Sequence, residues 1–371
     1  MMKAARFSTF ARAGALFLGC ATLPAHAQSS VTLYGLLDTG VEYLTNANKT
    51  NKALIQSSSG NIQASRWGIK GVEDIGGGYA TTFTLEAGIS PSNGTLALNG
   101  REYGRQATVG FRGNGNELWV GREYNPMYQM GHLFDPASYG LYSLPTQDPG
   151  VSARGDNAIR YQRIIGQFTV DAFYSLGYDT LGAPIGGTSG ASSQAKDLAF
   201  AVHYAGPSIG YEFLYDNLHG PLAAAGTGLT AIDTTLTAQP STTADRAQRY
   251  IATASYKFDR TTLYAGYRLL KVNYAGNSIN ANLFWTGFRQ QVSTQWALVG
   301  ALYQTVVPGK DVKPFSSVVE VKYLLSKSTF LYANGSYVKN SANSTLAVDS
   351  GGNTLPGQNQ LGVELGIFHA F

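Results

Sequence analysis

The sequence has one cysteine, Cys20, in 371 residues, and only 13% of its residues are charged. A single thiol cannot form a disulfide within the chain, and it cannot supply the paired cysteines of a structural zinc site. The five histidines include no His-Glu-x-x-His pair, and no Gly-x-Ser-x-Gly motif is present. The common metal-protease and serine-hydrolase motifs are therefore missing, and we expect neither an enzyme nor a cofactor.

Long apolar runs are also missing: no segment approaches 18 consecutive apolar residues, so we expect no transmembrane helix. The short apolar stretch 13–23 follows three basic residues and precedes the small-residue tripeptide Ala25-His26-Ala27. This order predicts a signal peptide over residues 1–27 and a mature chain over 28–371. Its removal would lower the formal net charge from +4 to near +1. That balance does not indicate a nucleic-acid partner.

Glycine and aromatic residues are abundant, with 44 Gly, 23 Tyr and 17 Phe. Tyr and Phe favour strands, and frequent glycine disfavours long helices. Within residues 79–89, Phe83 and Leu85 share one parity while Thr84 and Glu86 share the other. Side chains of a strand alternate between its faces, so this pattern predicts a strand with one apolar and one polar face.

Sixteen segments of this kind follow one another, and the connections between them are alternately short and long. This arrangement is the signature of a bacterial outer-membrane barrel, in which closure satisfies every backbone polar group within lipid. We expect the last segment, which ends at Phe371, to pair with the first. A soluble propeller or β-helix would show a repeat of fixed length, and none is present. The predicted strands are 31–43, one ending at 66–73, 79–89, 101–112, 117–123, 157–163, 168–178, 197–204, 208–216, 246–257, 261–273, 281–288, 294–306, 314–324, 329–338 and 358–371.

Several motifs resemble, in order, those of the general porins of Gram-negative β-proteobacteria such as Burkholderia and Neisseria. The resemblance covers the whole mature chain and implies an all-β fold, a 16-stranded antiparallel transmembrane β-barrel, usually a homotrimer. One departure is Trp67, where the family would have Phe. The matching motifs are Ser30–Gly40, Ser65–Asp74, Gly104–Gly110, Val120–Pro126, Arg154–Tyr161 and His369–Phe371.

The long segment of about 124–156 contains four prolines, which forbid ordinary ladder pairing, and many apolar residues. Such a segment would make a poor exposed loop but could pack against a barrel wall. In the resembled family the third external loop folds inward and forms the pore constriction, and we expect the same of this segment.

The resemblance also implies a cluster of arginines on the wall opposite that loop. Parity places Arg66 and Lys70 on the polar face of their strand, and Arg160 likewise. Arg105 shares its parity with Val109, so it would face the pore only through a bulge or a reversal of faces. The candidate residues of the constriction are Arg66, Lys70, Arg105, Arg122, Arg154 and Arg160 on the wall, with Asp135 and Asp148 on the loop.

The sequence thus predicts an outer-membrane channel for passive diffusion of ions and small hydrophilic solutes. Because arginines outnumber acids in the candidate constriction, we expect a mild anion preference, unless carboxylates neutralise the arginines. Two alternatives remain, a channel specific for one small solute and a non-conducting barrel that acts as an adhesin. The expected partners are two further copies of the chain, outer-membrane lipid and lipopolysaccharide, and an assembly machinery that reads the terminal Phe371.

Overall fold

The computed structural model describes residues 30–178, 196–222, 227–229, 232–237, 239–349 and 352–371. The signal peptide predicted over residues 1–27 lies outside these residues and stays a prediction. The described strands form one antiparallel sheet. No described helix is long and apolar enough to cross a membrane.

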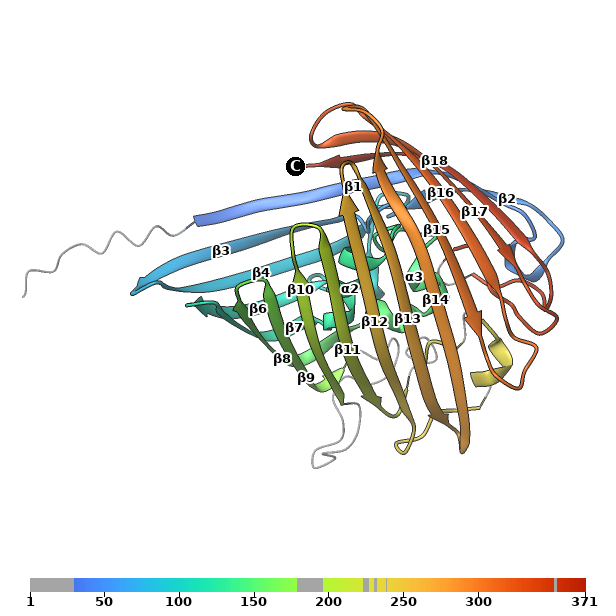
Figure 1. Cartoon of the computed structure of the whole chain (residues 1–371), viewed down its shortest axis with the longest axis horizontal. Helices are drawn as coiled ribbons and strands as arrows, with labels where there is room; N and C mark the ends of the chain where they lie inside the picture. The colour runs from blue at the N-terminus through green and yellow to red at the C-terminus, as the bar shows by residue number, and fades with distance from the viewer. Residues whose placement is uncertain (1–29, 179–195, 223–226, 230–231, 238, 350–351) are drawn as a thin grey trace, which may run out of the picture.

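The sheet closes on itself because its first and last strands pair (Figure 1). β1 (Ser30–Leu44) pairs with β18 (Gln360–Ala370). β2 (Leu54–Ser59) and β3 (Arg66–Gly76) both pair with β1 and so share one position in the wall, and β5 (Thr95–Leu96) is a short strand beside β4. The eighteen strands of the sheet therefore fill sixteen positions, and the predicted 16-stranded barrel is confirmed.

The remaining strands follow in chain order around the wall, and each pairs with its neighbours. They are β4 (Tyr79–Ser90), β6 (Gln106–Gly113), β7 (Asn116–Tyr124), β8 (Arg154–Ile165), β9 (Phe168–Tyr178), β10 (Asp197–Ala205), β11 (Ile209–His219), β12 (Arg246–Phe258), β13 (Thr261–Tyr274), β14 (Asn277–Gln291), β15 (Trp296–Val306), β16 (Phe315–Leu324) and β17 (Thr329–Lys339).

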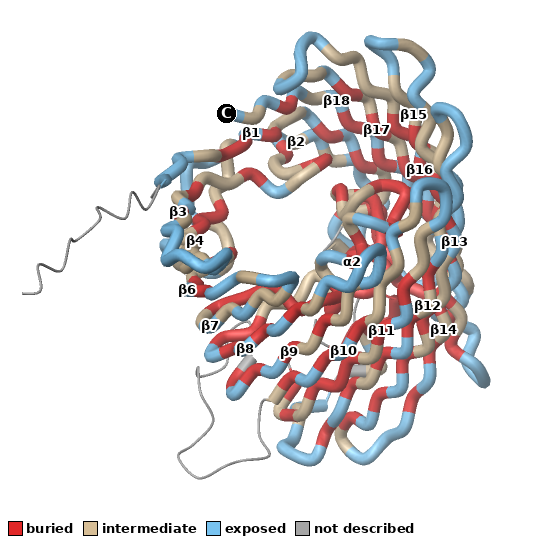
Figure 2. Tube along the Cα trace, turned by 60° about the vertical axis from the view of Figure 1, so that its left-hand side comes forward, coloured by how far each residue is buried: buried red, intermediate tan, exposed pale blue. Residues whose placement is uncertain are grey.

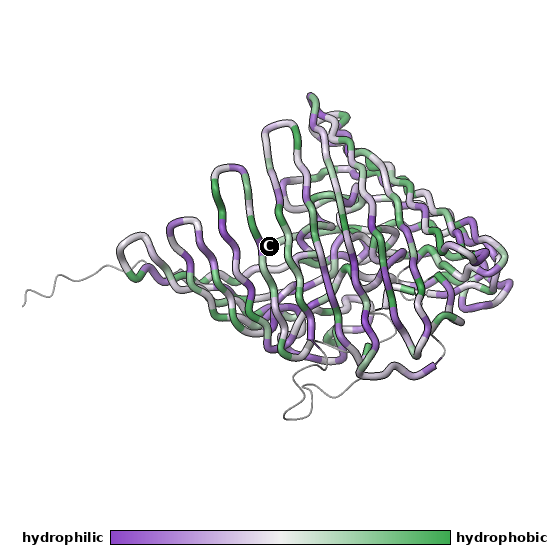
Figure 3. The backbone as a smooth tube through the Cα atoms, turned by 60° about the horizontal axis from the view of Figure 1, so that its bottom comes forward, coloured by the Kyte–Doolittle hydropathy of each residue, from purple (hydrophilic) through white to green (hydrophobic). Residues whose placement is uncertain are grey.

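Residues of opposite character alternate along the strands, as the sequence predicts (Figure 3). In β18, Leu361, Leu365 and Ile367 are exposed on the outside, whereas Glu364 is buried and accepts a hydrogen bond from Ser58 Oγ at 2.8 Å. The outer surface is apolar because it faces lipid, and the polar faces point into the barrel.

The predicted boundaries differ most from the structure at two connections, before β6 and between β13 and β14. The segment 101–105 precedes β6, because the chain before it forms the short helix α1 (Ala97–Gly100). β13 and β14 meet at Ala275 and Gly276, both with positive φ. A two-residue turn of this kind matches the twist of paired strands, so the two strands extend further than the sequence predicted.

The connection between β7 and β8 lies inside the ring of strands (Figure 2). It contains α2 (Pro126–Phe134), α3 (Leu144–Gln147) and a 3-10 turn, η2 (Pro149–Ser152). Trp285 Nε1 of β14 donates a hydrogen bond to the carbonyl oxygen of Phe134 at 3.1 Å. Two further short turns, η1 (Ala47–Lys49) and η4 (Thr234–Thr237), belong to other loops.

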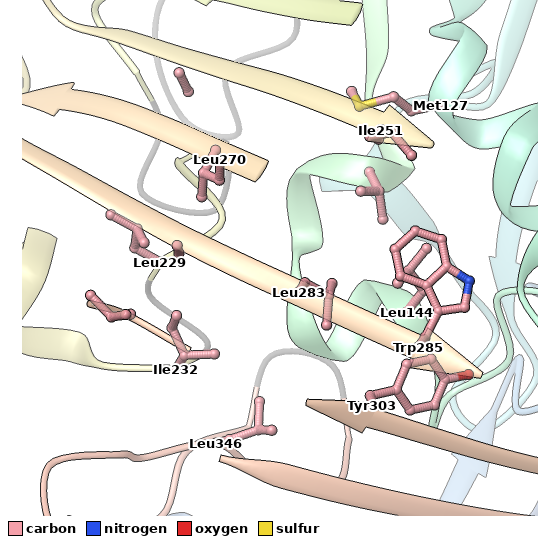
Figure 4. Close-up of a cluster of buried hydrophobic side chains, with 14 of the residues drawn as sticks. Met127, Leu144, Leu229, Ile232, Ile251, Leu270, Leu283, Trp285, Tyr303 and Leu346 are labelled. Carbon is pink, nitrogen blue, oxygen red and sulfur yellow. The ribbon is translucent and has the colours of Figure 1, made fainter. Parts of the chain in front are cut away.

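Apolar residues of three loops pack together against the inner wall of β12 to β15 (Figure 4). The third loop contributes Met127 and Leu144, and two later loops contribute Ile232 and Leu346. The amide of Thr345 donates to the carbonyl oxygen of Ile232 at 3.0 Å, which joins the two later loops. This packing fills the lumen on the β12–β15 side, so the open part of the barrel lies toward β3 to β8. The wall residues of the cluster include Ile251, Leu270, Leu283, Trp285 and Tyr303.

Candidate functional site

The helix α2 divides the barrel interior because its two faces differ. Asn125 caps its first turn, with Oδ1 accepting from the amide of Met127 at 2.9 Å, and Pro126 follows in the first turn. Met127 and Met130 are buried toward the wall. Tyr128 and His132, four residues apart, lie together on another face and line the open space.

Two cavities adjoin this aromatic face of α2. One, of about 370 Å³, is bordered by Arg105, Tyr139 and Arg154, and the other, of about 390 Å³, by Tyr124 and Arg160. Tyr128 and His132 border both. We call the place where the two cavities meet the neck, and define it by Arg105, Tyr124, Tyr128, His132 and Arg154.

Glu86 of β4 organises the wall beside the neck. Its Oε1 accepts from Arg105 Nε at 2.7 Å and from Tyr124 Oη at 2.9 Å. Its Oε2 accepts from Tyr34 Oη at 2.9 Å and lies 3.5 Å from Arg66 Nε. One buried carboxylate thus holds two of the predicted arginines, and the three side chains together carry a net positive charge.

Irregular pairing turns Arg105 into the barrel. The amide of Arg105 donates to the carbonyl oxygen of Glu86, which the ladder pairs with Gln106. Two residues therefore oppose one, as in a bulge, and the alternation of faces is broken at this point. Of the two possibilities that the sequence left for an inward Arg105, a bulge or a reversal of faces, this bond corresponds to the bulge. Arg105 Nη2 donates to Tyr128 Oη at 3.0 Å.

A second irregularity does the same for Arg122. Val120 of β7 is exposed on the outside, and simple alternation would place Arg122 there too. The register of β7 on β8 shifts between Gly121 and Glu123. Arg122 is consequently buried, with Nη1 2.7 Å from Asp156 Oδ1 and Nε donating to the carbonyl oxygen of Gly104 at 2.6 Å.

Arg101 also reaches Asp156, with Nη1 3.0 Å from Oδ1. Arg101 is not among the residues predicted for the constriction, because its segment is predicted as a strand, whereas it lies in the loop that follows α1. Lys70 lies on the same face of β3 as Arg66, with its Nζ 5.0 Å from the ring centroid of Tyr34. Lys70 borders neither cavity of the neck.

The guanidinium of Arg154 lies over the aromatic rings of the neck. Its guanidinium carbon is 4.6 Å from the ring centroid of Tyr124 and 5.4 Å from that of Tyr128. Among the described residues, no carboxylate lies within 4.0 Å of its nitrogens, and its buried Nε has no acceptor. The charge of Arg154 is therefore available to a solute in the neck.

Arg160 is neutralised on the other side of the neck. Its Nη2 lies 2.6 Å from Asp171 Oδ2, and its Nη1 lies 3.5 Å from Glu123 Oε1. Nη2 also donates to Gln129 Oε1 of α2 at 2.7 Å. One arginine with two carboxylates leaves this side of the neck without an excess of positive charge.

The two predicted acids of the loop lie away from the arginine cluster. Asp135 is fully buried, and it accepts hydrogen bonds from the amide of Tyr139 at 3.0 Å and from Tyr303 Oη at 2.5 Å. Burial raises the pKa of Asp135, although these hydrogen bonds oppose the rise. Asp135 therefore stabilises the fold of the loop, and its hydrogen-bond partners are not the arginines of the predicted constriction.

Asp148 is likewise buried, behind the loop against β12. Its carboxylate accepts from Arg249 Nε at 2.9 Å and from Arg249 Nη2 at 3.0 Å. Burial raises the pKa of Asp148, but the charges of Arg249 and Arg268 outweigh burial and hold it below its usual value. The position of Asp148 thus differs from the prediction, because its ionic partners lie on the opposite wall from the arginine cluster.

The aromatic residues of the neck were not among the sequence candidates. Tyr124, Tyr128 and His132 are spaced four residues apart in a segment otherwise rich in apolar residues. This spacing could have indicated one polar aromatic face, had a helix been assigned there. The described part of the chain contains no group of three or more His, Cys, Asp or Glu side chains that could hold a metal ion.

Comparison with known proteins agrees with this architecture. Residues 13–343 match the family of Gram-negative porins. The chain is 30% identical to outer membrane porin protein 32 of Delftia acidovorans, over 96% of this chain and 98% of that protein. It is 29% identical to an outer membrane porin protein of Bordetella pertussis, over 89% and 94% of the two chains.

Among solved structures, an anion-selective porin from Comamonas acidovorans superposes with a TM-score of 0.77 at 25% identity. The superposition covers 93% of this chain and all of that one. The outer-membrane protein OmpT of Vibrio cholerae, at 13% identity and a TM-score of 0.66, shares the fold, over 92% and 98% of the two chains. The chain belongs to the Gram-negative porin family and forms a channel in the bacterial outer membrane.

Proposed function

We propose that the third loop narrows this passive channel at the neck and that the neck favours anions. The supporting observation is the position of Arg154, which borders the cavity and has no carboxylate within 4.0 Å among the described residues. A charge in a narrow water-filled passage, with low-dielectric walls, attracts ions of opposite sign.

The surrounding wall adds to the same charge. Arg66 and Arg105 share Glu86, and Arg101 and Arg122 share Asp156, so each carboxylate is outnumbered by arginines. The porin from Comamonas acidovorans that superposes on this chain is described as anion-selective, which supports the same preference here. The paired Arg160 limits the excess to one side of the neck, so the preference should be mild.

Replacing Arg154 with glutamine should reduce the anion preference of the channel. A unit charge about 5 Å from a passing ion contributes roughly 0.8 kcal/mol in bulk water, favourable for chloride and unfavourable for potassium, so we expect the permeability ratio of chloride to potassium to fall roughly 15-fold. The reversal potential of the refolded protein in a potassium chloride gradient measures this ratio. Arg246→Gln is the matched control, because Arg246 is exposed on the outer face of β12. A wild-type channel that prefers cations, or equal ratios for wild type and Arg154→Gln, would refute the proposal.

The charge of the neck should also stay constant between pH 8 and pH 5. Burial, together with the positive charges of Arg66, Arg105, Arg289 and Arg154, lowers the pKa of His132 to about 4. An ordinary histidine would gain a proton across this range. Since the unfolded chain binds that proton first, acidification from about pH 6.5 to 5 should cost stability while adding almost no charge to the neck. The reversal potential at pH 8 and at pH 5 measures this. The expectation would be contradicted if the wild-type channel became more anion-selective at pH 5 and the His132→Gln channel did so less.

We also propose that the barrel forms a homotrimer and contacts membrane lipid and lipopolysaccharide through its apolar outer surface. Phe371 would be read by the assembly machinery, since the residue is 56% exposed at the closing seam. There its amide donates to the carbonyl oxygen of Gly35 at 3.0 Å. A mass measurement of the detergent-solubilised protein that found monomers alone would contradict the trimer, and unimpaired assembly after deletion of Phe371 would contradict the assembly role.

A further inference from the structure

We propose that the neck is a binding site for small aromatic carboxylates such as benzoate, and not only a charged passage. This inference rests on the proposed anion preference and adds a substrate class to it. It follows from two features found together at the neck, a cluster of aromatic rings and a guanidinium held against them.

The aromatic rings form a continuous group along the third loop. The rings of Tyr124 and Tyr128 are stacked, with centroids 4.0 Å apart and an angle of 16° between planes. His132 meets Tyr128 edge-on at 4.6 Å and 76°. Tyr139 lies 5.7 Å from Tyr128 and 5.5 Å from His132. The contacts of 4.6 to 5.7 Å fall within the range at which aromatic rings attract one another, so a further ring could join the group at a cavity-facing edge.

The guanidinium groups beside these rings suit a carboxylate. Arg154 is pre-oriented by its contacts with Tyr124 and Tyr128, and its Nε is a buried donor without an acceptor. Arg105 is held in place by Glu86 and Tyr128. Guanidinium groups bind carboxylates through directed hydrogen bonds, and fixing them beforehand reduces the entropy lost on binding.

The adjoining cavity can admit a ring. Its volume of about 370 Å³ lies in the range of small-molecule sites. The wall opposite α2 presents small residues, among them Gly60, Ala64, Gly88 and Ala97. Tyr128, His132 and Tyr139 border the cavity from the loop, and Arg105 and Arg154 border it as well. A benzoate could therefore place its ring against the loop aromatics and its carboxylate at Arg154.

The test compares two anions that differ in aromaticity. Benzoate and cyclohexanecarboxylate have the same charge and nearly the same size, so a purely electrostatic neck would treat them alike. We expect benzoate to inhibit chloride current through the wild-type channel in planar bilayers at a concentration roughly twofold to tenfold lower, the range that one additional aromatic pair would give. Equal inhibition by the two acids would overturn this inference.

Two variants of Tyr128 locate the site. Tyr128→Leu removes the ring and Tyr128→Phe keeps it, and both lose the hydrogen bond to Arg105 Nη2. We expect the preference for benzoate to persist in Tyr128→Phe and to disappear in Tyr128→Leu. A preference that survives in Tyr128→Leu would overturn the assignment to this ring cluster. If a Tyr128 variant does not fold, the comparison of benzoate with cyclohexanecarboxylate in the wild-type channel still tests the inference.

The reversal potential in the same bilayers separates this inference from the proposed anion preference. Chloride preference with equal inhibition by both acids would retain the anion preference and reject the aromatic site. A channel without chloride preference would reject the anion proposal itself.

Discussion

Replacing Arg249 with methionine should release the third loop from the barrel wall and widen the channel. The Arg249 guanidinium is fully buried between Asp148 of the loop and Asp216 of β11. It donates to both oxygens of Asp148, at 2.9 and 3.0 Å, and its Nη1 lies 3.2 Å from Asp216 Oδ2. Without Arg249, two buried carboxylates would lose their main partner, and the loop could relieve this only by moving Asp148 toward water.

The cluster of Arg249, Asp148 and Asp216 also holds the loop at a second point, through Asn125. Asn125 Nδ2 donates to Asp197 Oδ2 and to Asp216 Oδ1, both at 2.8 Å, while its Oδ1 caps α2. Asn125 and Asp148 flank the inward part of the loop, so the cluster ties both of its ends to neighbouring strands. Arg268 adds charge, since its Nε lies 3.4 Å from Asp148 Oδ2, but none of its nitrogens is oriented to form a hydrogen bond with a described residue. It is therefore a poor substitute for Arg249.

Removing one partner of a buried ion pair typically costs about 3–5 kcal/mol. We expect Arg249→Met to fold as a barrel with higher single-channel conductance, weaker anion preference and faster proteolytic cleavage between residues 126 and 152. Arg246→Met is the control, because Arg246 lies on the exposed outer face of the same strand. Adding Asp148→Leu to Arg249→Met should restore part of the protection, since an apolar pair can replace a buried ionic one. If Arg249→Met keeps wild-type conductance and protease resistance, the cluster does not hold the loop in place.

The barrel could be predicted from the sequence because a barrel wall requires only local regularity. Leu365 faces outward and Glu364 inward as a consequence of the period of two. The closing seam follows in turn, because a chain-terminal apolar strand in lipid must find a partner. These inferences need no knowledge of which distant residues meet.

Which side chains face the neck, and which partners they have, could not be predicted from the alternation of residues along the strands. Arg105 reaches the interior through an irregular amide bond to Glu86, and Arg122 through a register shift. Strict alternation along the sequence would place both side chains outside. The partner of Asp148 is 101 residues away along the chain, on a strand whose inner face is otherwise apolar near the loop. Charge type suggested that Asp148 would meet an arginine, but only the folded loop determines which one.

Replacing Gly121 with valine should damage the barrel more than a valine elsewhere in the wall, because Gly121 makes the register shift of β7 possible. Its φ is +133°, a conformation that L side chains rarely adopt. A Cβ at this position would lie 2.1 Å from the carbonyl oxygen of Ala107 on the paired strand. Valine must therefore move the backbone, and the shift that turns Arg122 toward Asp156 would be lost with it.

Backbone strain and overpacking at one site each cost about 1–3 kcal/mol, so we expect a loss of about 3 kcal/mol in the free energy of unfolding. Urea titration of the refolded barrel in detergent measures this loss. The matched control is Gly335→Val in β17, where no neighbouring atom lies within 4 Å of an added Cβ and φ is not positive. Gly121→Val should also lower the anion preference of any channel that forms, because Arg122 would turn outward, whereas Gly335→Val should leave it unchanged. Equal stability of the two variants would mean that the strands can absorb a side chain at Gly121, and the register shift would then need another cause.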